Sequence, residues 1–497
     1  MKKRPTRGAE PSEPEAAEDA PGPEHGELEL SERTMRDLVN ETMDRLMPHL
    51  RGLASAPSHR NNGARKLAAS LREGLPASGT DTQTVLRLLF DRVLPSGLAS
   101  AAPGYLAYVP GGGLFHAAVA ALIANATNRY VGIFQAAPGL VQLEQNVVRW
   151  FADLVGFPVE GGGVLTSGGS LANLAALVAA RTAKLPARFQ DGVLYTSTEA
   201  HRSVQKAAKV AGFLAEHVRA ISVDEHHRIR VDELLARITA DRALGLLPFL
   251  VVGNVGTTNT GAIDPLGELA DLARDERLWL HLDAAYGGFF LLTERGRRKL
   301  AGIERADSVT LDPHKGLFLP YGTGAIVVRD VETLRRAHHV EADYLPTPEA
   351  DRAFVDFASL SPELSRDARG LRVWLPLKMH GSIAFTRALD EKLDLARDAA
   401  ARIAAVPGVE MIAPPELSLF AFRVRFDGAA GPDLDAKNRR LLSLVNQRRR
   451  VLISGTMVPS GYVLRVCVLS FRTHVAQMDM LLDDLEASLR VLRARGW

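Results

Sequence analysis

The sequence predicts an α/β protein in which a large domain with a mostly parallel sheet is followed by a smaller α+β lobe. Three observations support this fold class. Between residues ~160 and ~330, short β-rich runs alternate with helical patterns, which is typical of parallel strands joined by crossover helices. After residue ~376, the pattern changes to one long helical stretch, two strands and a closing helix. A chain of 497 residues is also long enough for two or three packed lobes.

The chain divides into four expected segments. Residues 1–27 are rich in Pro, Glu, Ala and Gly and have almost nothing to bury, so we expect a disordered tail. Residues 28–110 form an N-terminal helical segment, in which apolar residues repeat at steps of three and four from Met35 to Leu50. This apolar face has no obvious partner nearby, so it is expected to pack on another lobe or on a partner subunit. The large domain then covers 111–375 and the small domain 376–497.

Runs of apolar residues give the expected elements within each domain. In the large domain, helical patterns cover 203–211 and 266–274. The small domain is expected to contain, in order, a helix over 377–405, strands at 417–424 and 463–470, and a helix over 475–492. The strands expected in the large domain are 193–196, 220–223, 249–252, 278–282, 308–311 and 325–328.

Composition excludes several classes of function. The chain has 60 Lys and Arg against 58 Asp and Glu, and this net charge of +2 gives no reason to expect nucleic acid or an anionic membrane as a partner. No apolar run approaches the ~18–20 residues that span a bilayer, and the basic N-terminus is not followed by the apolar core of a secretory signal. The single cysteine, Cys467, fits a reducing compartment, so the cytoplasm is the expected location. No metal-binding pattern of Cys or His is present, and no metal is expected.

A Gly/Ser turn runs directly into an apolar helical stretch. In Leu165-Thr-Ser-Gly-Gly-Ser-Leu-Ala-Asn173, Gly169 and Ser170 fall where that helix begins. Glycine lets the backbone approach an anion closely, and a helix N-terminus offers free N–H groups and the positive end of the helix dipole. The turn therefore suits a phosphate, although a capped helix after a tight turn explains the same residues. It is not a Walker loop, because the lysine and the spacing are missing.

Four further features fall at the ends of expected strands, where ligands bind in α/β folds. Asp283 ends one strand, and a carboxylate there can keep a heterocycle nitrogen protonated. Lys315 lies in Asp312-Pro-His-Lys-Gly316 after another strand and could be a reactive amine. His201 opens a helix and could stack on a planar ring, and Gly253–Gly261 displays hydroxyls at the same edge. Each feature alone also fits an ordinary turn cap, surface loop or helix cap.

One ligand would use all five features together. That ligand is a planar, phosphorylated aldehyde with a pyridine ring. If the features were purely structural, each of the five would need its own independent explanation at successive strand ends. We therefore expect pyridoxal phosphate as the cofactor, bound as a Schiff base by Lys315.

These motifs resemble those of the group II pyridoxal-dependent amino-acid decarboxylases, which include aromatic-L-amino-acid, glutamate, cysteine-sulfinate and histidine decarboxylases. The resemblance runs from about residue 80 to about residue 490. It implies that Lys315 is the Schiff-base lysine and that His314 belongs to the same Pro-His-Lys motif. Asp283 matches the aspartate that holds the pyridine nitrogen, and Ala285 matches the alanine that packs on the ring. His201 matches the histidine stacked on the other face of the ring.

The resemblance extends to the phosphate and the phenolic oxygen of the cofactor. Gly169 and Ser170 match the phosphate-binding turn. Thr258, or its neighbour Thr257, matches the hydroxyl near the phenolic oxygen. Asp312 stands where several members have an asparagine that helps to bind phosphate. A carboxylate is less suited to phosphate, so that role is not carried over to Asp312.

Three more resemblances concern the substrate side. Tyr108 lies in a segment similar to the family's Pro and aromatic substrate segment, so it is expected to line the substrate pocket. Gly111–Gly113 replace bulkier residues there and could make room for a larger, aromatic side chain. Tyr344 falls at the catalytic tyrosine of a segment that resembles the mobile catalytic loop, and Arg465 is a weaker candidate on a small-domain strand.

The resemblance also implies an architecture and a reaction. The architecture is that of the fold-type I, aspartate-aminotransferase-like pyridoxal enzymes, as a homodimer with active sites at the interface. The reaction is decarboxylation of an L-amino acid to an amine and CO₂, a step of amino-acid and carboxylic-acid metabolism, with Lys315, Tyr344, His201 and Asp283 as the catalytic residues. The alternatives are another lyase, a transaminase or an aldehyde synthase of the same fold, or an inactive homologue that binds or regulates. A dinucleotide enzyme is disfavoured, since no Gly-x-Gly-x-x-Gly opens the first βα unit.

Overall fold

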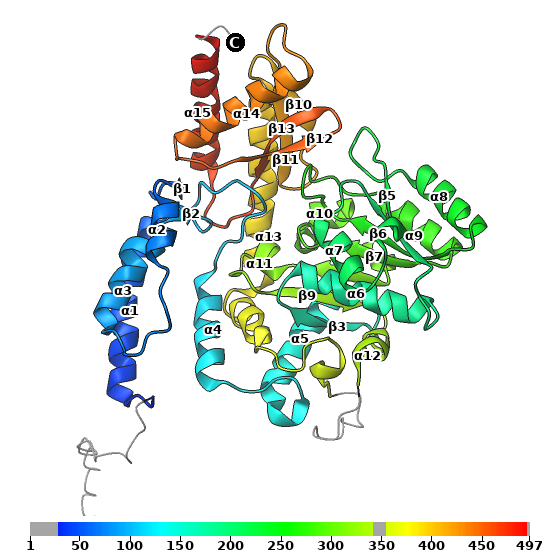
Figure 1. The fold of residues 1–497 in the computed structure, drawn as a ribbon, viewed down its shortest axis with the longest axis horizontal. Helices are drawn as coiled ribbons and strands as arrows, with labels where there is room; N and C mark the ends of the chain where they lie inside the picture. The colour runs from blue at the N-terminus through cyan, green and yellow to red at the C-terminus, as the bar shows by residue number, and fades with distance from the viewer. Residues whose placement is uncertain (1–27, 341–353, 495–497) are drawn as a thin grey trace, which may run out of the picture. The chain divides into compact units, whose positions relative to one another are not determined.

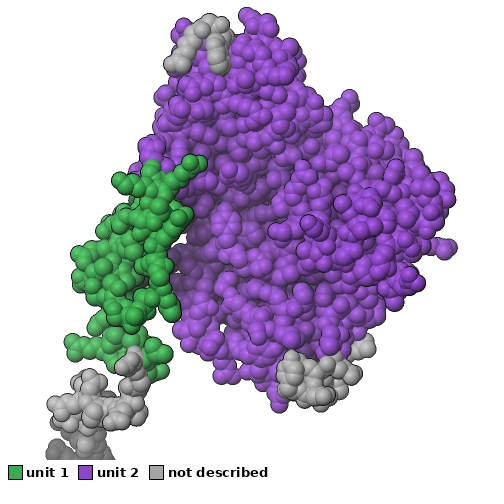
Figure 2. Space-filling view, in the orientation of Figure 1, with its two compact units in different colours: residues 1–52, 63–96 green, residues 53–62, 97–497 purple. Residues whose placement is uncertain are grey.

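The computed structural model describes residues 28–340 and 354–494. It consists of two compact units, Met1–Gly52 with Gly63–Ser96, and Leu53–Asn62 with Gly97–Trp497, coloured separately in Figure 2. The first unit is helical, as the apolar periodicity predicts, but no residue of its longest helix is buried. Its elements are α1 (Glu32–Gly52), α2 (Ala64–Ser70), α3 (Thr82–Arg87) and a π-helical stretch, Leu88–Val93.

The second unit is built on a sheet whose strands β3, β9, β7, β6 and β5 are labelled in Figure 1. In the described residues this sheet has seven strands in the order β3-β9-β8-β7-β6-β4-β5. Strands β8, β7, β6, β4 and β5 run parallel, whereas β9 is antiparallel to both of its neighbours. Every residue of β4, β7, β8 and β9 is buried, as expected for strands covered on both faces. The bounds are β3 Gly162–Thr166, β4 Gly192–Ser197, β5 Val218–Ile221, β6 Leu247–Asn254, β7 Trp279–Asp283, β8 Ser308–Leu311 and β9 Gly324–Val328.

Helices connect these strands and cover the sheet. The helix α6 (Gly169–Lys184) packs across β9, β8, β7 and β6, and its buried side is rich in alanine, which lets a helix lie close to a sheet. Both α7 and α12 pack against α6, whereas α5 contacts β3 and β9, and α9 contacts β6 and β7. The bounds are α4 Phe115–Thr127, α5 Pro138–Val155, α7 Arg202–Val210, α8 Val231–Ala243, α9 Leu266–Asp275, α10 Glu294–Lys299, α11 Pro313–Gly316 and α12 Glu332–His338.

A smaller lobe contains an antiparallel sheet with strand order β10-β11-β13-β12. The long helix α13 (Arg369–Ala404) contacts both lobes and breaks at Gly381, where φ is 70° and ψ is 159°. Buried aromatic and aliphatic side chains, among them Phe420 and Leu441, form a separate core for this lobe. Its elements are β10 Val409–Ala413, β11 Leu419–Val424, α14 Gly431–Gln447, β12 Ser454–Val458, β13 Gly461–Cys467 and α15 Val475–Arg493. The two-residue strands β1 (His59–Arg60) and β2 (Gly97–Leu98) pair with each other outside this lobe.

The predicted fold class, a mostly parallel α/β sheet with a smaller α+β lobe, is confirmed. The helix expected over 377–405 is in fact two helical stretches separated by the kink at Gly381; the first begins at Arg369 and the second ends at Ala404. The four segment boundaries stay a prediction.

Candidate active site

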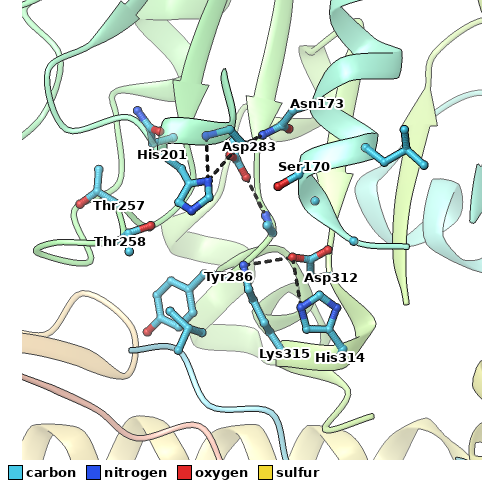
Figure 3. Close-up of a pocket in the computed structure, with 18 of the residues that line it drawn as sticks. Ser170, Asn173, His201, Thr257, Thr258, Asp283, Tyr286, Asp312, His314 and Lys315 are labelled. Atoms are coloured by element: carbon cyan, nitrogen blue, oxygen red, sulfur yellow. Dashed lines mark hydrogen bonds and ion pairs between the residues drawn. The ribbon is translucent and has the colours of Figure 1, made fainter. Parts of the chain in front are cut away.

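A cavity of about 280 Å³ lies at the carboxyl ends of β6, β7 and β8, the edge at which parallel sheets bind ligands (Figure 3). Its volume is near the lower end of the range for small-molecule sites. Eight residues expected at the site from the sequence line this one cavity: Gly169, Ser170, His201, Thr258, Asp283, Ala285, His314 and Lys315.

One wall of the cavity is the turn between β3 and α6. The Thr166 hydroxyl donates a hydrogen bond to the Gly168 carbonyl and so ties the turn together, 3.0 Å between the oxygens. Gly169 and Ser170 stand in the first helical turn, where backbone N–H groups have no partner within the helix. A Cβ at Gly169 would lie 3.0 Å from Asp312 Oδ2, so only glycine leaves this wall open. The turn can therefore bind an anionic group through its backbone.

Asp283 ends β7 and is 8% exposed. Its Oδ2 accepts a hydrogen bond from Asn173 Nδ2 at 2.9 Å, and its Oδ1 accepts one from the Ala285 backbone N–H at 3.2 Å. These two donors fix the plane of the carboxylate, while the small Ala285 side chain leaves the space beside it open. A carboxylate held in this way can keep a proton on a ring nitrogen.

Lys315 lies in the short helix α11, which follows β8. Its Nζ is 3.0 Å from Asp312 Oδ2, and Asp312 is 2% exposed. Burial acts to lower the pKa of Lys315, but the carboxylates of Asp312 and Asp283 outweigh it and raise that pKa. His314 donates from Nδ1 to the Thr323 carbonyl at 2.7 Å, which leaves its Nε2 3.6 Å from Asp312 Oδ2.

The remaining predicted ring and hydroxyl groups come from two loops. His201 precedes α7, and its Nδ1 accepts the Ser203 backbone N–H at 3.2 Å. Thr257 and Thr258 both line the cavity, but the Thr257 hydroxyl is already bonded to Thr260 at 2.7 Å and to the Ala262 backbone N–H. Thr258 is therefore the better candidate for a ligand hydroxyl.

Two predicted residues, Tyr108 and Arg465, are not among the described residues that line the cavity. Tyr108 is 58% exposed, although its neighbour Val109 lines the wall. Tyr344 lies outside the described residues, so its role stays a prediction from the sequence. Arg465 is 3% exposed on β13, where it donates to Ser454 Oγ at 2.9 Å.

The expectation that Gly111–Gly113 make room for a large substrate is wrong at Gly111 and Gly112. A Cβ at Gly111 would lie 2.7 Å from the His314 carbonyl oxygen, and one at Gly112 would lie 2.5 Å from the Phe471 ring. The space that these glycines leave is filled by the protein's own backbone and aromatic side chains. Gly111 and Gly112 therefore carry no information about substrate size.

Among the residues that line the cavity, Asn173, Ser203, Asn254 and Tyr286 were not singled out from the sequence. Asn173 could have been found from its spacing, because four residues after Gly169 it returns to the same face of the helix. Tyr286 and Asn254 gave no such signal. The Tyr286 hydroxyl bonds to Ser418 of the smaller lobe at 3.0 Å, a contact that only the folded chain reveals.

These groups fit pyridoxal phosphate. The α6 turn suits the phosphate, Asp283 the ring nitrogen, His201 and Ala285 the two faces of the ring, and Lys315 the aldehyde. Asp312 is the one unfavourable group beside a phosphate, and its ion pair with Lys315 partly offsets its charge. No group of three or more His, Cys, Asp or Glu able to hold a metal occurs in residues 28–340 and 354–494.

Comparison with known proteins identifies the family. The conserved domain of pyridoxal-dependent decarboxylases matches residues 68–425, more than half of the chain. The chain belongs to the pyridoxal-dependent decarboxylase family. Aromatic-L-amino-acid decarboxylase of Bacillus atrophaeus is 36% identical over 93% of this decarboxylase and 96% of the relative. L-2,4-diaminobutyrate decarboxylase of Rhizobium meliloti (strain 1021) is 32% identical over 93% of both chains.

A solved structure agrees with this family assignment. The crystal structure of Oryza sativa TDC with PLP and tryptamine matches the decarboxylase with a TM-score of 0.88 and 26% identity, over 93% of this chain and 99% of that one. The protein is thus a pyridoxal-phosphate-dependent amino-acid decarboxylase, and an amino acid is its substrate. None of the helices in the described part of the chain is long and apolar enough to cross a membrane.

Proposed function

We propose that this enzyme converts an aromatic L-amino acid to the corresponding amine and CO₂. The observation that carries the proposal is the 36% identity, along nearly the whole of both chains, to an aromatic-L-amino-acid decarboxylase. The likeness to the rice structure with tryptamine supports the same substrate class. Since a diaminobutyrate decarboxylase is 32% identical, diaminobutyrate is the competing substrate to test.

When bound, pyridoxal phosphate supplies an electron sink for the pair left by departing CO₂. In our proposal, Asp283, held by Asn173 and the Ala285 N–H, keeps the proton on the ring nitrogen. His201 and Ala285 would hold the two faces of the ring, an orientation effect that can contribute several kcal/mol. Lys315 Nζ would hold the cofactor, and the Asp312 carboxylate, 3.0 Å away, is placed to accept the proton that the ammonium group must lose before it can do so.

We also propose a cytoplasmic homodimer with the active site at the interface. The exposed apolar residues of α1, among them Met35, Leu38 and Val39, support an assembly in which this face is covered. Sedimentation of the full chain should give the mass of two copies, and a monomer at micromolar concentration would contradict the dimer.

The reaction is tested with a panel of amino acids that includes tryptophan, tyrosine, phenylalanine, diaminobutyrate, glutamate and cysteine sulfinate. Released CO₂, amine, aldehyde and peroxide are measured for each. We expect CO₂ and amine in equal amounts from an aromatic substrate, with no peroxide. Lys315→Ala should lower turnover by at least about a thousandfold, whereas Lys299→Ala, on the surface of α10, should leave it unchanged. Aldehyde with peroxide, or preference for diaminobutyrate, would contradict the proposal.

A further inference from the structure

A buried polar stripe lies between α6 and the centre of the sheet. Side chains two residues apart point to the same face of a strand, so His281 and Asp283 of β7 share one face. Their partners on β8 are Ser308 and Thr310. All four contribute to one hydrogen-bonded group, with Asn173 of α6 at its centre.

Asn173 is 2% exposed, and both ends of its amide are fully used. Its Oδ1 accepts a hydrogen bond from the Thr310 hydroxyl at 2.7 Å and lies 3.0 Å from His281 Nε2. Its Nδ2 donates to Asp283 Oδ2 at 2.9 Å and to Ser203 Oγ at 2.8 Å. An asparagine amide has two donors and two acceptor sites, and here each one has a partner.

The orientation of this amide follows from Asp283, whose ionised carboxylate can only accept and therefore faces Nδ2. Asn173 Oδ1 then faces His281 Nε2. Burial lowers the pKa of His281 to about 4, so at neutral pH the ring has one proton. Because Oδ1 can only accept, the contact between them places this proton on Nε2. On the other side of the ring, Ser308 Oγ accepts from the Trp279 indole N–H at 2.8 Å and can donate its own proton to His281 Nδ1, also at 2.8 Å.

A second chain of hydrogen bonds runs from Asn173 through Ser203 to His201. The Ser203 Oγ accepts from Asn173 and lies 2.7 Å from His201 Nδ1, which also accepts the Ser203 backbone N–H (Figure 3). A backbone N–H can only donate, so His201 Nδ1 has no proton and the Ser203 hydroxyl donates to it. One amide therefore supports Asp283 directly and His201 through a single hydroxyl.

We propose that Asn173 is a positioning residue for the cofactor ring, setting the carboxylate of Asp283 and the imidazole of His201 relative to each other. The proposal rests on the roles assigned above to these two side chains. Because both contacts to the ring share one buried support, their spacing is fixed before the cofactor binds, and binding loses less conformational freedom.

The test is Asn173→Asp, which keeps the shape and the acceptor oxygen but removes both donors. Two carboxylates about 3 Å apart repel each other unless they share a proton. The affinity for pyridoxal phosphate is measured by titrating the cofactor into cofactor-free protein. The variant should bind more weakly than the native protein, and the ratio of the two affinities should grow to at least about tenfold as the pH rises from about 6 to about 9. The titratable groups that surround the pair are His281 on β7, His201 before α7, and Asp312, His314 and Lys315 around α11.

Two further variants separate positioning from a general loss of structure. Asn173→Leu removes the donors without adding charge, so its affinity should fall by a similar factor at every pH. Asn438→Asp makes the matched change in α14, where the buried amide bonds to the Val424 backbone; it should lower stability but leave cofactor affinity and its pH dependence unchanged.

Binding within twofold of the native protein from pH 6 to 9, with the same visible circular dichroism of the bound cofactor, overturns the proposal. If Asn173→Asp does not fold, Ser203→Ala is decisive, because it removes only the hydroxyl between Asn173 and His201. It should change the circular dichroism of the bound cofactor, and an unchanged spectrum overturns the proposal. These measurements need no substrate, so a native protein that binds the cofactor but releases no CO₂ contradicts the proposed function alone.

Discussion

At the scale of single residues, the chemistry depends on how a buried lysine keeps or loses its proton. A lysine must be neutral to attack the aldehyde of the cofactor, and burial favours the neutral form. Asp312, 3.0 Å from Lys315 Nζ, opposes this effect, and the pKa of Lys315 is raised. We therefore expect Asp312 to favour the ammonium form of Lys315 in the cofactor-free enzyme and to slow covalent capture of the cofactor at neutral pH.

Asp312→Asn should therefore accelerate covalent capture. Without this carboxylate, the pKa of Lys315 falls and a larger share of the amine is neutral at pH 7, so the rate at which lysine-bound cofactor forms should rise several-fold. Its pH profile should move to lower pH. Stopped-flow absorbance between pH 6 and 9 measures both quantities. Asp307→Asn, at the other end of β8, is the matched control and should leave the rate and its pH profile unchanged. Identical pH profiles for the native protein and Asp312→Asn would show that Asp312 does not set the pKa of Lys315.

At the scale of elements, the sequence predicts six strands of the large sheet, in chain order, and the residues at their carboxyl ends. It does not predict β3 of that sheet, nor β10 and β12 of the smaller lobe, where it gives two strands and the described residues form four. Strand-end residues such as Asp283 and Lys315 could be found because a motif and an apolar run lie next to each other in the sequence. Asn173 could not be assigned its role, because its partners on β7, β8 and α7 meet only when the sheet forms. Packing likewise explains the wrong expectation at Gly112. The space beside this glycine is occupied by the ring of Phe471, a residue distant in sequence.

The first turn of α6 is expected to bind the phosphate of the cofactor. In Gly169→Ala, the new Cβ would lie 3.0 Å from Asp312 and 3.3 Å from the Ala285 Cβ, on the wall where the phosphate is expected. We expect at least a tenfold loss of pyridoxal-phosphate affinity, measured by titration of the cofactor-free protein. Gly139→Ala at the start of α5, where a Cβ meets nothing within 4 Å, is the control and should bind as the native protein does. Equal affinities for the two variants would remove the turn from the phosphate site.

At the scale of the whole molecule, the site is held by polar groups in the centre of the large sheet. Such groups link folding stability to pH, because a buried histidine must stay neutral in the folded state. Burial lowers the pKa of His281 to about 4, against about 6.5 in the unfolded chain. Between these values the unfolded chain binds more protons, so the stability contributed by His281 is present above pH ~6.5 and is lost as the pH falls to ~4.

This effect can be isolated by comparing the native protein with His281→Gln. The difference in their free energies of unfolding should shrink by up to about 3 kcal/mol as the pH falls from 6.5 to 4. Urea denaturation of the cofactor-free proteins measures it. Other groups, such as Asp264, whose pKa burial raises to about 6, act in both proteins and cancel in the difference. A difference that stays constant with pH would mean that His281 titrates normally in the folded state.

The central claim is that Lys315 binds the cofactor in the cavity at the ends of β6, β7 and β8. The most direct measurement is to load the full chain with pyridoxal phosphate, reduce it with borohydride, digest it and locate the modified peptide by mass spectrometry. The account predicts one phosphopyridoxyl group per chain, on Lys315. A group on a different lysine, or no stable modification at all, would contradict it.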